Sequence, residues 1–430
     1  MKGFGDWDKS KKTITKTPNL SKKQIINLAL KLHSQGNLSE AAKYYQYCIK
    51  EGFSDYRVYS NYGVILRDLG KLKEAIICQN KAIELNPSYK KAYSYLGGIL
   101  ILLGNFKKAE FFTRKSIELD PNNAEENSNL GYILMNLKKL KEAEFFTRKS
   151  IELNPEDAKT HFNLSNILRE RDNLKGAKLS YYKAIELKPN FPQAHRELSL
   201  CLYLLGEKNK SLQSILKANY LDPNNFKNKL LLKFFEKEKN IKNQDQRING
   251  NKKFSLESNP FLDSIPVEKK LVNSLYKIKA RNQEIHQGPT YGNTKGSDYK
   301  LFENKDSNIK SIRKKLISIA KKCVQSDILI SSSFFTIFRS GGGLISHDHL
   351  GEIDKIKGLN IAKEKFSLVY YLSVGDQKCD EPGILKLEKP NQDILPSNGL
   401  IIIIPADRKH SVFYKGGKDR IIIGVNFYRV

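Results

Sequence analysis

Three histidines near the C-terminus have a spacing that suits a metal ion. His347 and His349 are two positions apart in ISHDHL, and His410 follows some sixty residues later, directly before a strand-like segment. In an extended chain, residues two apart leave the same face, so both imidazoles can converge on one point while Asp348 points away. Closure of a barrel could bring His410 to that point. Because imidazole is a common ligand for Fe, Zn, Cu and Ni, the pattern predicts a metal centre.

The identity of the third ligand stays open between two kinds of site. Two histidines and one carboxylate on one face leave coordination positions free, an arrangement typical of non-haem Fe(II) oxygenases. His349 would instead give a three-histidine set, whereas Asp348, Glu352 or Asp354 would supply the carboxylate. A single histidine is usually an ordinary core or surface residue, but the spacing of these three favours a metal. We expect His349 as the third ligand, because strand alternation turns Asp348 away unless a bulge re-aims it.

The elements around these histidines have a period of two. Short segments rich in Ile, Val, Tyr and Phe are separated by Gly, Pro, Asn and Asp: SSSFFTIFR, FSLVYYLSV, GILKLEK, GLIIIIPA, HSVFY and RIIIGVNFYRV. Such segments predict an antiparallel sandwich or jelly-roll barrel. Helical patterns over residues 267–281 and 308–323 precede them. Tyr370 and Tyr371 fall on opposite faces of their strand, so only one of them can line the interior.

The order of these segments resembles the double-stranded β-helix of the 2-oxoglutarate- and Fe(II)-dependent oxygenases, near the prolyl 4-hydroxylase-like branch. The resemblance covers roughly residues 285–430 and rests on ISHDHL, FSLVYYLSV, GILKLE, DILPSNGLIIIIPADRKHSV and DRIIIGVNF, in that order. It implies an enzyme that binds Fe(II), uses O2 and 2-oxoglutarate, and hydroxylates an unactivated C–H bond while releasing succinate and CO2.

The resemblance also implies a role for individual residues. His347 matches the first metal ligand of the HxD motif, and His410 matches the distal ligand. Arg420 follows His410 by ten residues, where the family has the cation that pairs with the far carboxylate of 2-oxoglutarate. A guanidinium binds a carboxylate through two parallel hydrogen bonds and stays charged when buried. Gly383 begins GILKL, which fits the GxLxF-like strand of the family.

Two departures from the family pattern bear on the site. His349 stands where HxD has its carboxylate, and Ile422 stands where many relatives have the serine of RxS. The serine contact to the cosubstrate is therefore missing. Asn426 falls on the same face as Arg420 by alternation, so it is the candidate to line the cavity and bind the cosubstrate instead.

The N-terminal half carries an internal repeat of 34 residues. Small residues and prolines recur at this spacing: Gly36, Gly70, Gly104 and Gly206; Ala41, Ala75, Ala109, Ala143 and Ala177; Pro87, Pro121, Pro155, Pro189 and Pro223. The pattern resembles the tetratricopeptide repeat, in about six copies over residues 22–224. The GPTYGN segment at Gly288 and the SFFTIF strand are similar to those oxygenases that are fused to such repeats. Departures are Phe53 where Pro is expected, and Lys138 and Asp172 at the turn glycine.

Each repeat contains two helical patterns whose apolar face needs a neighbouring repeat to cover it. Stacking therefore predicts an all-α superhelix with a concave groove. The resemblance implies that the groove binds a polypeptide through side chains of the first helix in each repeat. Candidates are Asn61, Tyr95, Asn129, Asn163 and Arg196. The alternative for each of them is a solvated polar position without a special role.

These patterns predict a two-domain chain with four segments. They are an N-terminal tail (residues 1–21), the repeats (22–224), a capping helix with a polar linker (225–260) and the jelly roll (261–430). Composition adds broader expectations. The five cysteines form no CxxC pair, which argues against disulfides and thiolate zinc sites. No apolar run approaches the roughly 20 residues of a membrane span, and the first residues lack the apolar stretch of a secretory signal. We expect a cytoplasmic protein that does not enter membranes.

The net charge of +28 would attract polyanions, but the lysines are scattered, so nucleic-acid binding rests on charge alone and is not expected. Two alternatives to a hydroxylase with a protein-binding superhelix stay open. One is a scaffold whose barrel is inactive, and the other is a three-histidine metal enzyme that does not use a 2-oxo acid. The sequence identifies neither the substrate nor the oligomeric state.

Overall fold

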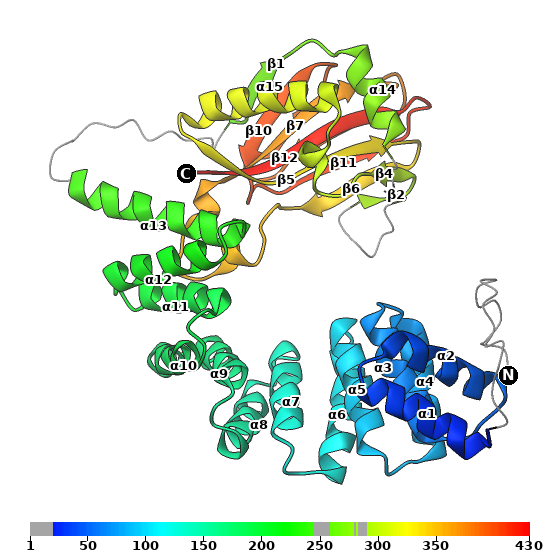
Figure 1. Cartoon of the computed structure of the whole chain (residues 1–430). Helices are drawn as coiled ribbons and strands as arrows, with labels where there is room; N and C mark the ends of the chain where they lie inside the picture. The colour runs from blue at the N-terminus through cyan, green and yellow to red at the C-terminus, as the bar shows by residue number, and fades with distance from the viewer. Residues whose placement is uncertain (1–19, 245–258, 279–280, 283–289) are drawn as a thin grey trace. The chain divides into compact units, whose positions relative to one another are not determined.

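The computed structural model describes residues 20–244, 259–278, 281–282 and 290–430 (Figure 1). Residues 1–19 of the predicted tail, residues 245–258 of the predicted linker and the start of GPTYGN at Gly288 lie outside this range. The chain divides into two compact units, residues 1–201 and 202–430. This division falls inside a helix of the repeat region, further N-terminal than the boundary predicted near residue 260.

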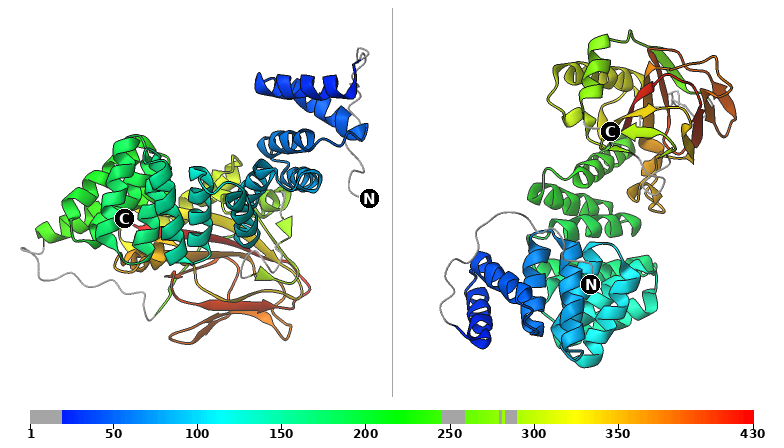
Figure 2. Two further views of the ribbon diagram at one scale, coloured as in Figure 1. Left: turned by 90° about the horizontal axis from the view of Figure 1, so that it is seen from below. Right: turned by 90° about the vertical axis from the view of Figure 1, so that its right-hand side faces the viewer.

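The described part of the first unit is entirely helical. Its helices are α1 (Lys22–Ser34), α2 (Leu38–Lys50), α3 (Tyr56–Asp68), α4 (Leu72–Leu85), α5 (Lys90–Leu102), α6 (Phe106–Leu119), α7 (Ala124–Asn136), α8 (Leu140–Leu153), α9 (Ala158–Glu170), α10 (Leu174–Leu187) and α11 (Pro192–Leu204), the last of which continues into the second unit. Consecutive helices pair as hairpins that lie side by side (Figures 1 and 2).

The 34-residue period positions the close contacts inside each hairpin. A Cβ atom on Gly97 would lie 2.6 Å from the Thr113 hydroxyl of the second helix, and one on Gly131 would lie 2.1 Å from that of Thr147. These glycines are therefore required where two helix backbones approach each other. Alanines at the same spacing, such as Ala109 and Ala143, are fully buried.

The turn between the two helices of a hairpin keeps one conformation even where glycine is absent. Gly70 and Gly104 have φ angles of 74° and 70°, and Lys138 and Asp172 have 60° and 61° at the equivalent positions. The sequence departures therefore leave the hairpin geometry intact. They place two residues with side chains in the left-handed region, which glycine enters at lower cost.

The second unit begins with the end of α11 and contains further helices and two antiparallel sheets. Its other helices are α12 (Lys208–Leu221), α13 (Phe226–Gln244), α14 (Lys269–Lys277), α15 (Ser307–Val324) and the short 3-10 segments η1 (Leu301–Glu303), η2 (Ile353–Lys355) and η3 (Ile361–Glu364). Helix α13 lies where the capping helix was predicted, and α14 and α15 lie within or close to the predicted helical segments. None of the helices in the described ranges is long and apolar enough to cross a membrane.

The larger sheet has seven strands and the smaller has five. The larger sheet has the order β1 (Phe261–Ser264), β10 (Leu400–Pro405), β7 (Lys365–Ser373), β12 (Arg420–Arg429), β5 (Ile328–Phe338), β4 (Thr294–Gly296) and β2 (Arg281–Asn282). The smaller sheet has the order β3 (Thr290–Tyr291), β6 (Gly342–His347), β11 (His410–Tyr414), β8 (Pro382–Leu387) and β9 (Gln392–Ile394). The predicted antiparallel strands are thus confirmed, and the finer assignment as a jelly roll stays a prediction.

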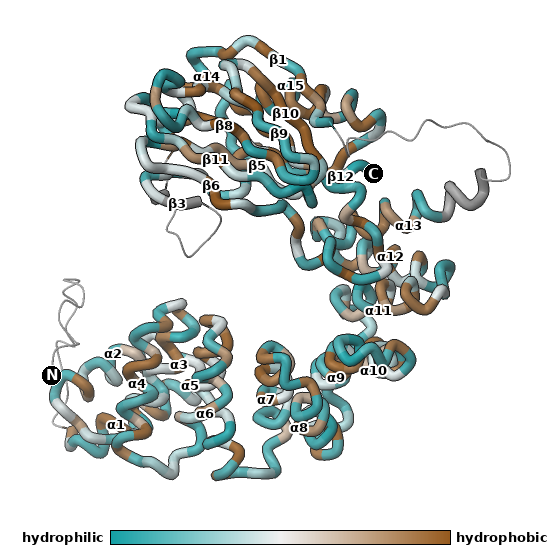
Figure 3. Tube along the Cα trace, turned by 180° about the vertical axis from the view of Figure 1, so that it is seen from behind, coloured by the Kyte–Doolittle hydropathy of each residue, from teal (hydrophilic) through white to brown (hydrophobic). Residues whose placement is uncertain are grey.

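Alternation along the strands of the larger sheet separates two hydrophobic layers. Ile421 and Ile423 of β12 belong to a core that includes Leu271 of α14 and Leu316 of α15, so these helices cover one face of the sheet. Ile422 belongs to a second core that contains residues of both sheets. Strand β10 and its neighbours are strongly hydrophobic (Figure 3). The face of β12 that carries Ile422 is therefore directed at the smaller sheet, and the candidate site lies on this side.

Candidate metal centre

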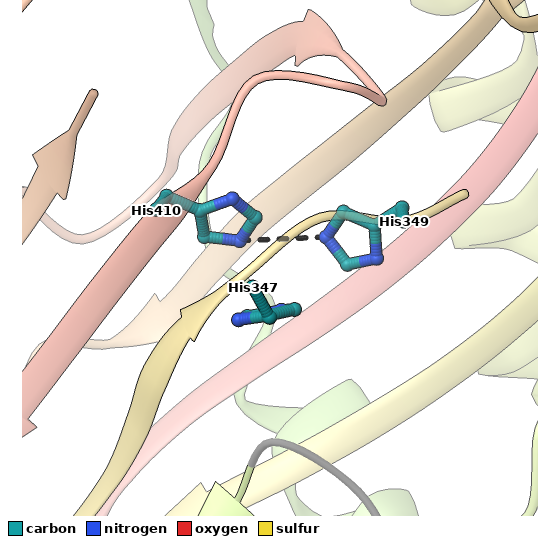
Figure 4. Close-up of side chains that lie close together, drawn as sticks. All are labelled: His347, His349 and His410. Carbon is teal, nitrogen blue, oxygen red and sulfur yellow. Dashed lines mark hydrogen bonds between the residues drawn. The ribbon is translucent and has the colours of Figure 1, made fainter. Parts of the chain in front are cut away.

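The pairing of β6 with β11 brings two of the three histidines together. His347, the last residue of β6, and His410, the first residue of β11, are direct cross-strand partners. Because partners opposite each other on antiparallel strands point to the same face, their side chains lie side by side. His349 follows β6 and is held by a backbone hydrogen bond of 2.8 Å from its N–H to the carbonyl of Ala406. Figure 4 shows the three imidazoles gathered at this point.

The imidazoles are close enough to share one ion. The ring centroids lie 4.4 Å apart for His347 and His410, and 5.0 Å apart for each pair that includes His349. One ring nitrogen of each residue lies within 4.8 Å of the others. The Nε2 atoms of His349 and His410 are 3.4 Å apart. Two nitrogens bound at about 2.1 Å to one tetrahedral ion are separated by roughly this distance.

Backbone carbonyls orient two of the rings. His347 Nδ1 lies 2.9 Å from the carbonyl oxygen of Ile345, and His410 Nδ1 lies 3.3 Å from that of Arg408. Since a carbonyl oxygen only accepts hydrogen bonds, each Nδ1 must carry the proton. Each Nε2 then keeps its lone pair for a metal, which is the arrangement that supports many histidine ligands in metal sites.

Burial keeps the three imidazoles in the neutral, metal-binding form. Burial is the main cause of the lowered pKa of His347. It also lowers the pKa of His410 to about 4, with a further contribution from the nearby His347. Burial also holds the pKa of His349 well below its usual value, and the two other imidazoles and Lys365 add to this effect. A proton therefore competes weakly with a cation for this cluster at neutral pH.

The neighbouring carboxylates have other partners. Asp348 accepts a hydrogen bond of 3.0 Å from the backbone N–H of Leu350, and the side chain of Glu352 is 95% exposed. Asp354 accepts hydrogen bonds from Lys365 Nζ at 2.7 Å and from the Tyr428 hydroxyl at 2.8 Å. Within the described ranges, the cluster that includes His347 and His410 is completed by His349 and contains no carboxylate. That this cluster binds a metal stays a prediction.

The histidines line a cavity of about 400 Å³ between the two sheets. Ile422, Gly424 and Asn426 of β12 form part of its wall, together with Lys365 of β7. The structure thus brings the predicted Asn426 to the same cavity as the histidines. A role for Asn426 in binding a cosubstrate stays a prediction.

Arg420 lies outside the cavity lining but inside the core between the sheets. It is two residues before Ile422 on the same face of β12, is 1% exposed, and has its guanidinium 5.2 Å from the centre of the Tyr371 ring. Its Nη1 donates to the carbonyl oxygen of Gly383 and, at 3.3 Å, to that of Pro382. Tyr371 is therefore the member of the tyrosine pair that faces this interior, whereas Tyr370 belongs to the core under the helices.

The guanidinium of Arg420 retains a donor without an acceptor. Its Nε is buried and has no hydrogen-bond partner. None of the ion pairs found in the described ranges includes Arg420. Burial lowers the pKa of Arg420 from its usual value, but a guanidinium remains charged in proteins. Such a group is suited to bind an anion that enters the core.

Sequence reasoning missed the polar network beside His349. Asp354, Lys365 and Tyr428 are buried together, and Lys365 Nζ also lies 5.1 Å from the centre of the Tyr428 ring. Asp354 Oδ2 accepts a further hydrogen bond of 2.7 Å from the N–H of Gly351, in the loop that follows His349. The sequence marked Asp354 only as a candidate metal ligand, and no local signal marked Lys365 or Tyr428 as its partners.

The repeats contain a separate cavity of about 820 Å³. Two predicted candidates, Asn129 and Asn163, line it together with the aromatic rings of Tyr132, Phe162 and Phe191. The other three candidates, Asn61, Tyr95 and Arg196, are not part of its lining. Asn61 donates to the Tyr45 hydroxyl at 3.3 Å, and Arg196 pairs with Glu197 at 3.1 Å.

Comparison with known families identifies the helical hairpins. Sequence models of the tetratricopeptide repeat match residues 56–89, 90–123, 112–145 and 158–191. The first unit contains tetratricopeptide repeats. The prediction of this repeat is therefore confirmed, and the repeats are associated with binding of peptides or proteins. The matched residues all precede the second unit, so the resemblance of residues 285–430 to the 2-oxoglutarate oxygenases stays a prediction.

Solved structures match part of this chain at low sequence identity. YrrB, described as a repeat protein with an unusual peptide-binding site, is 23% identical, with 44% of this chain and 96% of that chain covered and a TM-score of 0.38. MamA from Desulfovibrio magneticus is 23% identical, with 39% and 95% covered and a TM-score of 0.37. PilF from Pseudomonas aeruginosa is 17% identical, with 50% and 97% covered and a TM-score of 0.44. The curated proteins contain no match to this sequence.

Proposed function

We propose that the second unit is an Fe(II)- and 2-oxoglutarate-dependent hydroxylase, and that the repeats bind its polypeptide substrate or a partner protein. The observation that carries the proposal is the convergence of His347, His349 and His410 in a cavity between two antiparallel sheets. The pairing order of the central strands, β10-β7-β12-β5 in one sheet and β6-β11-β8-β9 in the other, is compatible with a double-stranded β-helix.

The residues of the cluster fit a divalent transition metal. Three neutral imidazoles offer nitrogen donors of the kind that Fe(II) accepts, and they come from one side of the cavity, so other coordination positions would stay open. An Fe(II) ion held there would supply the oxidative chemistry. The chain's own contribution is to fix the tautomers of His347 and His410 through the carbonyls of Ile345 and Arg408. The cavity lining would hold the reacting groups beside the cluster.

The surroundings of Arg420 fit the far carboxylate of a dicarboxylic cosubstrate. A buried guanidinium without an acidic partner is unfavourable, and its unused Nε is directed to no protein acceptor. A carboxylate that reached Arg420 would satisfy both the charge and the donor. In the overall reaction, one atom of O2 would enter the C–H bond of the substrate as a hydroxyl, while 2-oxoglutarate would lose CO2 and take up the other oxygen atom to become succinate.

The groove of the repeats is the proposed protein-binding surface. Tyr132, Phe162 and Phe191 provide apolar ring surface, and the amides of Asn129 and Asn163 can hydrogen-bond a peptide backbone. This combination suits an extended segment of polypeptide. It would keep a substrate at high local concentration near the enzyme unit.

A three-histidine metal enzyme that does not use a 2-oxo acid is the second candidate. Two observations favour it: His349 stands where the oxygenase family has a carboxylate, and Arg420 does not line the cavity. In that case the free coordination positions would bind a different substrate directly.

Binding measurements on the full-length chain separate the candidates. Fe(II) is titrated without oxygen, followed by 2-oxoglutarate or its unreactive analogue N-oxalylglycine, and binding is measured by calorimetry. We expect both to bind, with the analogue lost in Arg420→Met and both lost in His410→Ala. Metal binding without analogue binding would support the second candidate. Absence of metal binding would refute both and leave a scaffold. Release of succinate with candidate peptides then tests turnover.

A further inference from the structure

A row of polar side chains crosses the cavity wall on three adjacent strands. Asn426 of β12 is the cross-strand partner of Ser332 on β5 and of Ser367 on β7, and all three residues line the cavity. Residues opposite each other in this way share a face of the sheet. The next row toward Arg420 consists of Phe334, Gly424 and Val369 and contains no polar side chain.

The amide of Asn426 has an unused acceptor. The residue is 8% exposed, and its Nδ2 donates to the Ser332 hydroxyl at 3.0 Å. Its Oδ1 is buried without a hydrogen-bond partner. A buried amide oxygen left unpaired is unfavourable. The row therefore offers an acceptor to a ligand, with two serine hydroxyls beside it that can donate or accept.

The distance along β12 separates this row from Arg420. Six residues at about 3.4 Å each place the two positions about 20 Å apart, whereas the four carbon–carbon bonds of a five-carbon diacid span at most about 6 Å. Because the Arg420 guanidinium is held at the carbonyl of Gly383 on the smaller sheet, one cosubstrate molecule does not bridge Arg420 and Asn426. If Arg420 binds the cosubstrate, the row belongs to the primary substrate, which revises the sequence-based pairing of the two residues.

The row is electrically neutral. Lys365 is the one lysine or arginine among the residues that line the cavity, and it is paired with Asp354 at 2.7 Å, with both side chains almost fully buried. Beside the row, the Phe334 ring covers Gly424, and a Cβ atom on Gly424 would lie 2.4 Å from this ring. Tyr299, which is 57% exposed, contacts this ring edge-on. A planar neutral group with both a donor and an acceptor fits this environment better than a carboxylate or an alkyl chain.

We propose that Ser332, Asn426 and Ser367 form a subsite that binds a primary carboxamide, as in an asparagine or glutamine side chain of the bound polypeptide. The N–H of the carboxamide donates to Asn426 Oδ1, and its carbonyl accepts from the Ser367 hydroxyl. This assignment rests on the proposed function, because it takes the cavity to be the place where substrate meets the metal.

The experiment compares three short peptides that differ only in the central residue. Peptides with asparagine, leucine or aspartate between pairs of glycines, capped by acetyl and N-methylamide so that no other primary amide is present, are titrated into the metal-free full-length chain. Ligand-observed NMR gives the dissociation constants. We expect the asparagine peptide to bind at least tenfold more tightly than either of the others.

Three variants test whether the preference for the asparagine peptide arises at the proposed subsite. Asn426→Leu should abolish it, Ser367→Ala should weaken it several-fold, and Asn391→Leu, at an exposed asparagine in a turn, should leave it unchanged. In case Asn426→Leu does not fold, the result for Ser367→Ala tests the proposal on its own. Equal binding of the three peptides, no measurable binding of the asparagine peptide, or a preference that survives the first two variants would overturn the proposal. Because no metal or turnover enters this readout, such a failure is distinct from a failure to bind Fe(II) or 2-oxoglutarate.

Discussion

His347 and His410 are direct cross-strand partners on β6 and β11, and their ring centroids lie 4.4 Å apart. Sixty-three positions separate them in the sequence, so their meeting depends on the register of this strand pair. A shift of one residue in the pairing would turn one imidazole to the opposite face. The geometry of the cluster is therefore a property of the sheet and does not rest on a flexible loop, except at His349.

Replacement of His410 by alanine should remove most of the affinity for Fe(II). His410 is 3% exposed and fixed on a strand, so no neighbouring side chain can take its place. We expect a loss of at least about a hundredfold, since changes that only affect the support of a metal ligand already cost 10- to 100-fold. Anaerobic calorimetry measures it. The control is His161→Ala in the repeats, where the ring contacts the carbonyl of Pro155 at 2.9 Å and should not affect metal binding. Equal affinity in both variants would rule out the centre.

The turn at Lys138 offers a test of the repeat geometry. Lys138 has a φ of 60°, and the equivalent glycines have similar angles. Lys138→Gly should stabilise the first unit by up to about 1 kcal/mol, because a side chain in the left-handed region costs roughly that amount and the exposed ion pair with Glu170 contributes little. Lys139→Gly is the control at a residue with a φ of −85°, where glycine relieves no strain. It should destabilise, because it also removes the ion pair of 2.9 Å with Glu110. Urea unfolding followed by far-ultraviolet circular dichroism distinguishes them; destabilisation by both glycines would contradict the argument.

The repeats were predictable because their signal is periodic and local. Ala109 and Ala143 recur 34 residues apart and are both buried, and Gly97 and Gly131 recur at the close contacts between helices. Each repeat has the same packing requirement, so the 34-residue pattern remains recognisable despite single departures such as Lys138. The strands of the second unit were predictable for a similar reason, since each is a short run rich in Ile, Val, Tyr and Phe that is bounded by turn residues.

The site was only partly predictable. Alternation predicted that His347 and His349 converge and that Asn426 faces the interior, and these residues lie at one cavity. His349, however, lies beyond the end of β6, where its backbone is held by Ala406. The hydrogen bonds from Lys365 and Tyr428 to Asp354 depend on long-range packing, which no short pattern records. The cross-strand row of Ser332, Asn426 and Ser367 likewise requires the register of three strands that are distant in the sequence.

Gly383 should be essential for the position of Arg420. Its φ is 81°, and a Cβ at this residue would lie 1.6 Å from Arg420 Nη1. Gly383→Ala therefore introduces both backbone strain and a displacement of the buried guanidinium, and we expect a loss of at least about 1–2 kcal/mol in the free energy of unfolding. Gly417→Ala, at a glycine with nothing within 4 Å, should have little effect. Binding of N-oxalylglycine to Gly383→Ala should weaken in parallel; unchanged stability and binding would show that Arg420 does not depend on this glycine.

Glu126 should make the first unit more stable at mildly acidic pH than at neutral pH. The side chain is 2% exposed, its Oε1 accepts a hydrogen bond of 2.6 Å from the Ser94 hydroxyl, and its Oε2 has no partner. Burial raises the pKa of this carboxyl above its usual value. The folded state then binds the proton more tightly than the unfolded state, so stability is lost as the pH rises from about 4.3, the usual value, through the raised pKa.

Glu126→Gln should remove this dependence and stabilise the first unit at pH 7 by about 1 kcal/mol, because the buried charge is replaced by a neutral amide of the same shape. Glu125→Gln, at an exposed residue one position earlier on α7, is the control for a change of charge alone. Urea unfolding at several pH values between 4 and 7 gives the comparison. If wild type and Glu126→Gln change in stability by the same amount over this range, Glu126 is not the group responsible.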